Sequence, residues 1–193
     1  MTEQPVEQRS LVISDPQVMR ALAHPARVEI MEHLSSTDTA ITATECAEIV
    51  GLSPSATSYH LRELARFGLV EQAPSRGDAR ERLWRSSVRS FGVEAGPDSS
   101  QEARAAQETL IEVYAARDYQ RIRAWARRLG DESKEWYDAT AYGGSVLMLT
   151  AEELTTLNAA VRELMKPYRR RDRTEPPEGA RPVAAHYMAM PID

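Results

Sequence analysis

The sequence predicts a mainly α-helical protein with short β hairpins, one long helix and a small α/β module at the C-terminal end. Three observations support this fold class. Apolar residues recur at helical spacing through most of residues 15–67. Two short strand-like runs then flank a loop that contains Pro, Ser, Gly and Arg. After a stretch rich in Gly, Pro and Ser, another helical pattern continues for about 30 residues.

Composition limits the class of protein. Of the 193 residues, 42% are hydrophobic and 27% are charged, which excludes a fully disordered, collagen-like or disulfide-rich chain. The single Cys46 excludes an intramolecular disulfide and suits a reducing compartment. No apolar run reaches the roughly 18 residues of a membrane span, and the first ten residues lack the pattern of a secretion signal. We therefore expect a cytoplasmic protein.

Three short helices are predicted after an N-terminal tail over residues 1–14. The first begins at Asp15 and continues toward His24 and Pro25. The second and third cover residues 26–34 and 45–50. A polar cluster at residues 35–38 is expected to end the second helix. Thr42 or Thr44 is expected to cap the third, and Gly51 to end it.

A fourth helix with a polar leading end is predicted within Leu52–Val70, whose sequence is LSPSATSYHLRELARFGLV. Ser53 has the residue type of an N-cap, and Pro54 suits the first helical position. Thr57, Leu61 and Leu64 recur at i, i+4 and i+7, so we expect them to face the core. The small polar residues of the first turns then lie mostly on the opposite face.

Two strands are predicted next, over residues 69–73 and 82–86, with a loop over residues 74–79 between them. Three short helices, a helix with a polar leading end and a hairpin follow one another in the order of a winged helix-turn-helix. We therefore predict such a domain over residues 15–91.

Charge is unevenly distributed along the chain. The formal net charge of the whole chain is -5, yet residues 54–89 carry 7 basic and 4 acidic side chains, a net charge of +3. A local basic surface attracts phosphates even where the total charge is negative. The fourth helix and the hairpin are therefore the expected place for a polyanion to bind.

The leading turns of a helix in the major groove of DNA must be slim, polar and free to hydrogen-bond. The predicted contacts from the fourth helix are Ser53, Pro54, Ser55, Ala56, Ser58, Tyr59 and Arg62. The predicted contacts from the hairpin, or wing, with the minor groove or with phosphates are Arg76, Arg80, Arg82 and Arg85.

Residues 15–89 resemble the ArsR-type bacterial winged-helix transcription regulators. The resemblance is carried by ALAHPARVEIMEHL and by the pattern L-S-x-S-x-x-S-x-H-L, which Leu52, Ser53, Ser55, Ser58, His60 and Leu61 match. The rest of the chain resembles larger actinobacterial relatives with an added C-terminal module. The resemblance implies a homodimer that binds an inverted-repeat operator, usually as a repressor.

The sequence departs from the metal sensors of that family. The positions of a familiar Cys-x-Cys pair are Thr42 and Thr44, and no histidine lies between Gln101 and Gly130, where the other familiar site has its ligands. We interpret Cys46 as a small buried apolar residue. We expect no metal and no cofactor, and the sequence contains no nucleophile elbow, phosphate-binding loop, zinc-protease motif or dinucleotide fingerprint.

A linker over residues 92–100 precedes a long helix over residues 101–130, for which Ser99 and Glu102 form a predicted capping box. A helix of this length needs a partner surface, and a second copy of the chain is the expected one. The predicted dimer contacts are Leu110, Val113, Tyr114, Ile122 and Trp125.

Residues 131–193 are predicted to form a strand-helix-strand module that serves dimerisation or effector binding. We expect strands over residues 145–149 and 183–190, and between them a helix over residues 151–166 that Thr150 and Glu153 cap. The arginine-rich run Arg169–Arg173 is expected to be a solvated loop, with contact to flanking DNA as the alternative.

The sequence thus predicts a homodimeric, sequence-specific DNA-binding transcription regulator that represses from an inverted-repeat operator. Two other classes stay open. The acidic total charge favours a winged-helix protein-interaction module without DNA binding. The aromatic residues after the linker leave room for a small-molecule-binding protein or an enzyme. No motif identifies the operator, the regulated genes, the direction of regulation or an effector.

Overall fold

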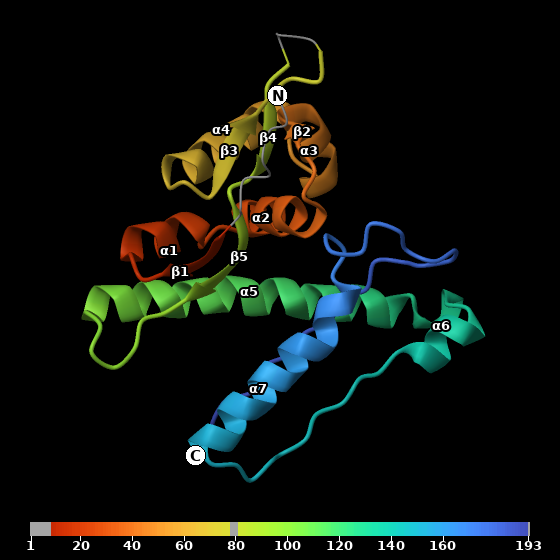
Figure 1. Cartoon of the computed structure of the whole chain (residues 1–193). Helices are drawn as coiled ribbons and strands as arrows, with labels where there is room; N and C mark the ends of the chain where they lie inside the picture. The colour runs from red at the N-terminus through yellow and green to blue at the C-terminus, as the bar shows by residue number, and fades with distance from the viewer. Residues whose placement is uncertain (1–8, 78–80, 193) are drawn as a thin grey trace. The chain divides into compact units, whose positions relative to one another are not determined.

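The computed structural model describes residues 9–77 and 81–192 (Figure 1). The chain divides into two compact units, Met1–Arg117 and Asp118–Asp193, with the boundary inside helix α5 (Gln101–Arg127). None of the described helices is long and apolar enough to cross a bilayer.

Four short helices open the first unit, and each is preceded by a capping side chain. They are α1 (Pro16–Leu22), α2 (Pro25–Thr37), α3 (Ala43–Val50) and α4 (Pro54–Arg66), with Asp15, His24, Thr42 and Ser53 as their caps. A side chain that accepts a hydrogen bond from the first turn satisfies a backbone N–H that would otherwise lack a partner. The four helices predicted from the sequence are thereby confirmed.

Helix α2 continues beyond the predicted end at residue 34. The hydroxyls of Ser35, Ser36 and Thr37 donate to the carbonyls of Glu32 and His33 in the preceding turn. These bonds let a polar cluster remain helical, although the same residue types often end helices. Asp38, with a left-handed φ of 55°, then ends α2.

The predicted hairpin is confirmed as part of a three-stranded sheet. Strands β3 (Val70–Ala73) and β4 (Leu83–Ser86) pair antiparallel, and β2 (Ile41–Thr42) pairs antiparallel with the other edge of β4. The order β2-β4-β3 attaches the wing to the start of α3. Strand β2 was not predicted, since two residues are too few to show an alternating pattern.

The expected tail over residues 1–14 is wrong for residues 9–13. They form β1 (Arg9–Ile13), which pairs in parallel with β5 (Val88–Val93). Strand β5 also takes in two residues that were assigned to the linker over 92–100. Because the two strands are far apart in sequence, no local pattern shows that each has a partner.

The core of the first unit joins all of these elements. Fully buried side chains from the short helices meet Leu69 and Val70 of the sheet region, and the first half of α5 adds Ala106 and Leu110. At the start of α5 the hydroxyl of Ser100 accepts from the backbone N–H of Ala103 at 3.1 Å. Ser100 is thus the capping side chain, and the predicted capping box of Ser99 and Glu102 is wrong.

The second unit contains the end of α5 and two further α-helices, α6 (Lys134–Ala139) and α7 (Ala151–Met165), with the short 3-10 turns η1 (Leu129–Asp131) and η2 (Lys166–Tyr168). The predicted capping box of α7 is confirmed. Thr150 Oγ1 accepts from the N–H of Glu153 at 3.2 Å, and the Glu153 carboxylate accepts from the N–H of Thr150 at 2.7 Å.

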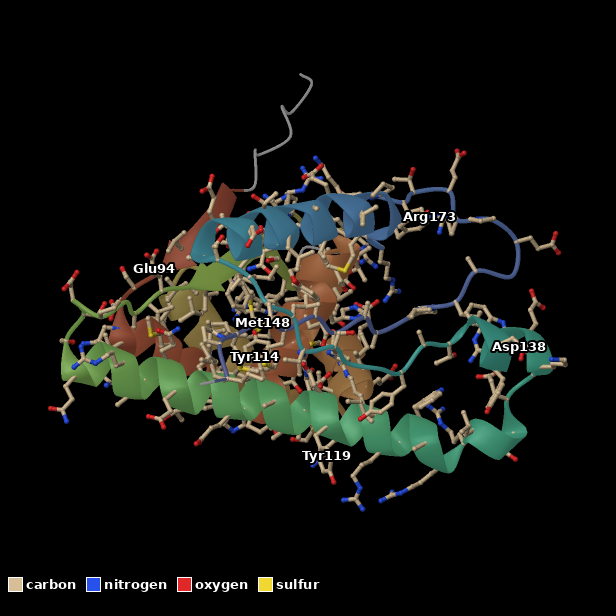
Figure 2. All side chains as sticks on the ribbon, turned by 90° about the horizontal axis from the view of Figure 1, so that it is seen from below. Glu94, Tyr114, Tyr119, Asp138, Met148 and Arg173 are labelled. Carbon is tan, nitrogen blue, oxygen red and sulfur yellow. The ribbon has the colours of Figure 1, made fainter. Side chains whose placement is uncertain are left out.

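The strands predicted over residues 145–149 and 183–190 are wrong. Both segments lack regular structure, and Figure 2 shows Met148 on the irregular segment between α6 and α7. The side chain of Met148 is 94% exposed. A short apolar run becomes a strand only where a neighbour accepts its backbone hydrogen bonds, and in the described chain neither run has such a neighbour.

Candidate DNA interface

Helices α3 and α4 are joined by a tight turn at Gly51. The φ of Gly51 is +66°, a left-handed conformation that glycine adopts without steric cost, and its N–H donates to the carbonyl of Ala47. The N–H of Leu52 also donates to that carbonyl, at 3.1 Å. The turn fixes the direction in which α4 leaves α3, as a helix-turn-helix requires.

The start of α4 is held by hydroxyl groups. Ser53 Oγ accepts from the N–H of Ala56 at 3.3 Å and lies 3.1 Å from Ser55 Oγ. Thr57 Oγ1 donates to the carbonyl of Ser53 at 3.1 Å. Ser53 therefore caps the helix, a structural role in addition to the DNA contact predicted for it.

The two faces of α4 differ as the sequence pattern indicates. Thr57, Leu61 and Leu64 have no exposed surface. The side chain of Tyr59 is 50% exposed. Of the other predicted contacts, the exposed ones are Ser53, Pro54, Ser55 and Arg62, and the half-buried ones are Ala56 and Ser58. All seven thus keep some solvent-accessible surface, whereas the opposite face of α4 is packed into the core.

A pair of histidines, His24 and His60, packs together at the buried side of α4. The ring of His60 lies 4.5 Å from the ring of His24, measured between centroids, and Arg27 Nε donates to His60 Nδ1 at 3.5 Å. His24 Nδ1 accepts from the N–H of Ala26 at 3.2 Å, which makes His24 the cap of α2. Both histidines thus combine ring packing with hydrogen bonding, the two roles expected from their places in the sequence motifs.

The surroundings of both imidazoles favour the neutral form. Burial, followed by the charge of Arg27, lowers the pKa of His24. Burial, then the neighbouring His24 and Arg27, lowers the pKa of His60. The edge of the His60 ring also meets the ring of Tyr59 at 5.5 Å, so the pair contacts a residue of the exposed face.

The predicted wing arginines have different surroundings. Arg76 donates to the carbonyl of Ala40 and lies 3.7 Å from the carboxylate of Glu45. Arg85 forms a 2.7 Å ion pair with Glu71 on the neighbouring strand. Arg82 is exposed, whereas Arg80 lies outside the described residues. Arg76 and Arg85 are thus already paired with carboxylates within the chain, which sequence spacing did not show.

The predicted dimer contacts on α5 differ in how far their own chain buries them. Leu110 is 1% exposed and packs into the core of its own chain, so its assignment to a dimer interface is wrong in this conformation. Tyr114 packs against the same core, with the guanidinium of Arg117 4.9 Å from its ring centroid. The half-buried Val113, Ile122 and Trp125 stay predicted contacts.

Cys46 is fully buried, as expected, and burial raises the pKa of its thiol to about 11. A thiol of that pKa is a poor metal ligand at neutral pH, since the thiolate is the form that binds metal. Thr42, at one position of the familiar cysteine pair, caps α3 instead. Among the described residues no three His, Cys, Asp or Glu side chains are grouped to hold a metal ion.

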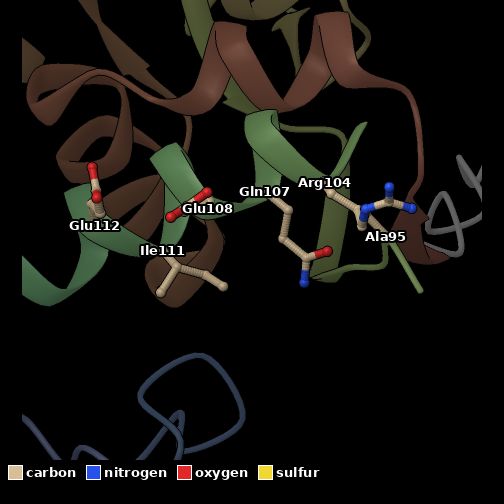
Figure 3. A pocket seen from close by; sticks show the side chains of 6 residues that line it. All are labelled: Ala95, Arg104, Gln107, Glu108, Ile111 and Glu112. Carbon is tan, nitrogen blue, oxygen red and sulfur yellow. The ribbon is translucent and has the colours of Figure 1, made fainter. Parts of the chain in front are cut away.

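An open hollow of about 440 Å³ lies along the outer side of α5 in the first unit (Figure 3). Its lining residues are Ala95, Arg104, Gln107, Glu108, Ile111 and Glu112. The Arg104 guanidinium is engaged by the carbonyls of Pro97 and Ser99. The hollow is a shallow helix surface without an enclosed, apolar interior of the kind that holds small ligands.

Residues 22–73 match a family model described as a helix-turn-helix domain. This match covers α2, α3, α4 and β3 and confirms the helix-turn-helix part of the resemblance drawn from the sequence. No curated protein sequence matches the chain. The resemblance of the C-terminal part to larger relatives stays a prediction.

Solved structures of low overall similarity include three bacterial proteins. Reduced HlyU from Vibrio cholerae is 28% identical, with 51% of this chain and 88% of that chain covered and a TM-score of 0.31. The homodimeric winged helix-turn-helix DNA-binding domain of a possible ArsR-family transcriptional regulator from Mycobacterium bovis is 23% identical (54% and 81% covered, TM-score 0.33). Apo MarR from E. coli is 15% identical (78% and 87% covered, TM-score 0.33).

Proposed function

We propose that this chain, whose residues 22–73 form a helix-turn-helix domain, is a sequence-specific DNA-binding transcription regulator of the winged-helix type. In this proposal α4 enters the major groove and the wing between β3 and β4 contacts the adjacent minor groove or phosphates. The protein acts in the cytoplasm as a homodimer on an inverted-repeat operator and represses by occupying a promoter.

One observation carries the proposal, namely the division of α4 into a buried face and an exposed polar face. The buried Thr57, Leu61 and Leu64 anchor the helix in the core, so the opposite face has a fixed orientation. That face offers the hydroxyl of Tyr59 and the guanidinium of Arg62 to solvent. Fixed hydrogen-bonding groups on a slim helix are what recognition of base edges requires.

The distribution of charge supports phosphate binding at the same place. Residues 54–89 have a net charge of +3 in a chain of net charge -5. Arg62 and Arg82 are exposed, and no ion pair to another described residue neutralises them. Each phosphate that such a side chain neutralises adds about 0.9 to the salt slope of binding.

The spacing of major grooves along a DNA duplex supports the proposal of a dimer. A single α4 contacts only a few base pairs, and two copies reach adjacent major grooves when they lie about one helical turn apart. The half-buried Val113, Ile122 and Trp125 of α5 are the contacts proposed for this dimer.

A protein-interaction module without DNA binding is the second candidate, because two of the wing arginines are already paired with carboxylates. The charges of Arg76 and Arg85 are paired with Glu45 and Glu71, and the chain as a whole is acidic. In that case the exposed face of α4 would contact a protein instead of a duplex.

Fluorescence anisotropy with a mixture of labelled genomic duplexes separates the two candidates. We expect binding that weakens steeply as salt increases, and a smaller salt slope for Arg62→Gln. Arg20→Gln on α1 makes the same charge change outside the proposed DNA contacts, at an arginine paired with Glu102 at 2.8 Å, and is expected to leave the slope unchanged. Binding that is absent at low salt would favour the interaction module, whereas equal slopes for Arg62→Gln and the unmodified chain would remove Arg62 from the proposed phosphate contacts.

A further inference from the structure

The second unit lacks a buried core. From residue 118 to residue 192 none of the described residues is buried, and the most sheltered apolar side chains are only half-buried. Two segments of this unit carry runs of exposed apolar side chains, residues 146–149 and residues 183–192, which we call the C-terminal apolar surface. Val146 is 78% exposed, Met148 94% and Ile192 73%.

Polar contacts hold the second of these segments, and the preceding Arg181, in place. Arg181 makes two hydrogen bonds with the carboxylate of Glu132, at 2.9 and 3.0 Å, and its guanidinium lies over the ring of Trp136. His186 and Tyr187, which lie later in the chain, also make polar contacts. His186 Nδ1 lies 3.0 Å from Asp118 Oδ2, and Tyr187 Oη donates to Asn158 Oδ1 at 2.9 Å. The polar side chains thus face the unit, while Val183 and Met188 stay exposed.

A unit without a buried core needs a packing partner that covers its exposed apolar side chains. Ordering a backbone costs conformational entropy, and the burial of apolar surface is the main compensation. Exposed surface ion pairs add little to stability. The arrangement of residues 118–192 therefore needs another apolar surface to pack against.

We propose that the cover is the same surface of a second copy of this chain. Among the described residues of the first unit, few large apolar side chains are exposed; they are Val12, Ile49, Leu52, Tyr59 and Ile111. Three of these five lie in or beside the helix-turn-helix, where DNA is proposed to bind. Among the described residues, the larger share of the exposed large apolar side chains belongs to the second unit, so two copies of this unit can cover each other by two-fold symmetry.

Area and charge agree with self-association. The C-terminal apolar surface contains enough large side chains, at roughly 100 Å² each, to supply on the order of 1,000 Å². A stable interface needs about 800 Å² from each partner. Residues 118–193 carry 12 basic and 12 acidic side chains, so two copies of the unit do not repel each other by net charge.

This inference rests on the homodimer of the proposed function and deepens it. It moves the main dimer contact from α5 to residues 146–149 and 183–192. It needs no DNA, so sedimentation of the protein alone tests it even if the proposed DNA binding fails.

Analytical ultracentrifugation of the full chain across a range of concentrations is the test. We expect the unmodified chain to be a dimer, and Met148→Glu with Met188→Glu to weaken the dimer by about 100-fold or more. Ile111→Glu is the matched control, because Ile111 is also an exposed apolar residue, 53% accessible, but lies on α5 in the first unit. It is expected to leave the dimer intact.

Three results would overturn the inference: a monomeric unmodified chain, an unchanged dimer in the Met148→Glu and Met188→Glu variant, or dissociation by Ile111→Glu alone. Hydrogen exchange of the unmodified chain gives a second measurement that requires no substitution. We expect peptides from residues 141–150 and 183–192 to become more protected as the protein concentration rises. Protection of these peptides at concentrations where ultracentrifugation finds only the monomer would mean that the cover comes from within the same chain.

Discussion

The rings of His24 and His60 lie 4.5 Å apart between centroids, which links the first turn of α2 to the middle of α4. His24 Nδ1 and His60 Nδ1 both accept hydrogen bonds, from the N–H of Ala26 and from Arg27 Nε. An accepting nitrogen carries no proton, so the arrangement requires neutral rings. Protonation of either Nδ1 would remove a hydrogen bond, at the start of α2 for His24 or between Arg27 and α4 for His60.

We predict a stability that falls in mild acid. Burial and Arg27 hold the pKa of both histidines below the ordinary value of 6.5, so the unfolded chain binds more protons than the folded chain in that range. The stabilisation is complete above pH 6.5 and is lost as the pH falls through the folded pKa values.

Urea unfolding at about pH 7.5 and about pH 5 measures this dependence. His24→Asn with His60→Gln removes the titration and keeps a capping residue type at the start of α2. We expect the variant to lose less free energy of unfolding than the unmodified chain between the two pH values. Equal losses would show that other groups cause the acid sensitivity.

Tyr59→Ala and Ser58→Ala are predicted to weaken or relax site selection. A lost base contact costs about 1–3 kcal/mol of binding free energy, while the free energy of unfolding changes little because neither side chain is part of the core. Tyr119→Ala is the matched control, since Tyr119 is an exposed tyrosine of the second unit. Binding selections with the three variants check this, and an unchanged operator preference in both α4 variants would remove the two residues from base recognition.

Arg82 and Arg85 are predicted to contribute differently to DNA binding. Arg82→Gln lowers the salt slope by about 0.9, because the exposed Arg82 is available to a phosphate. Arg85→Gln changes the slope less and lowers the free energy of unfolding by up to about 1 kcal/mol, because Arg85 is paired with Glu71 at 2.7 Å. Salt titrations and urea unfolding of both variants test this, and equal slope changes would contradict it.

Leu110 and Ile111 are neighbours on α5 with opposite surroundings. Leu110→Ala is predicted to lower the free energy of unfolding by about 2–5 kcal/mol, because Leu110 is 1% exposed within the core. Ile111→Ala is predicted to stay within about 0.5 kcal/mol, because Ile111 is 53% exposed. If Leu110→Ala dissociated a dimer without lowering stability, Leu110 would belong to an interface after all.

The helix-turn-helix was predictable because its signals are local. Ser53 and Pro54 start α4, Thr42 and Glu45 cap α3, and Gly51 turns the chain between them, each through contacts within a few residues. The buried and exposed faces of α4 likewise follow from helical spacing alone.

The features that sequence missed depend on distant partners. β1 is a strand only because β5 lies beside it. Helical spacing showed that Leu110 lies on an apolar stripe, but not that its own chain covers that stripe. Charge counting located Arg76 and Arg85 in the wing, but not the carboxylates of Glu45 and Glu71 that pair with them. The apolar runs near Met148 and Met188 were assigned to strands for the same reason, since periodicity does not reveal whether a partner exists.

Selection of bound duplexes from a random library, followed by the salt dependence of binding to the selected sequence, tests the central claim most directly. The account predicts an enriched inverted repeat, with half-sites about one helical turn apart and a steep salt slope. No enriched sequence, together with no salt-dependent binding at low ionic strength, would contradict the assignment of α4 and the wing to DNA.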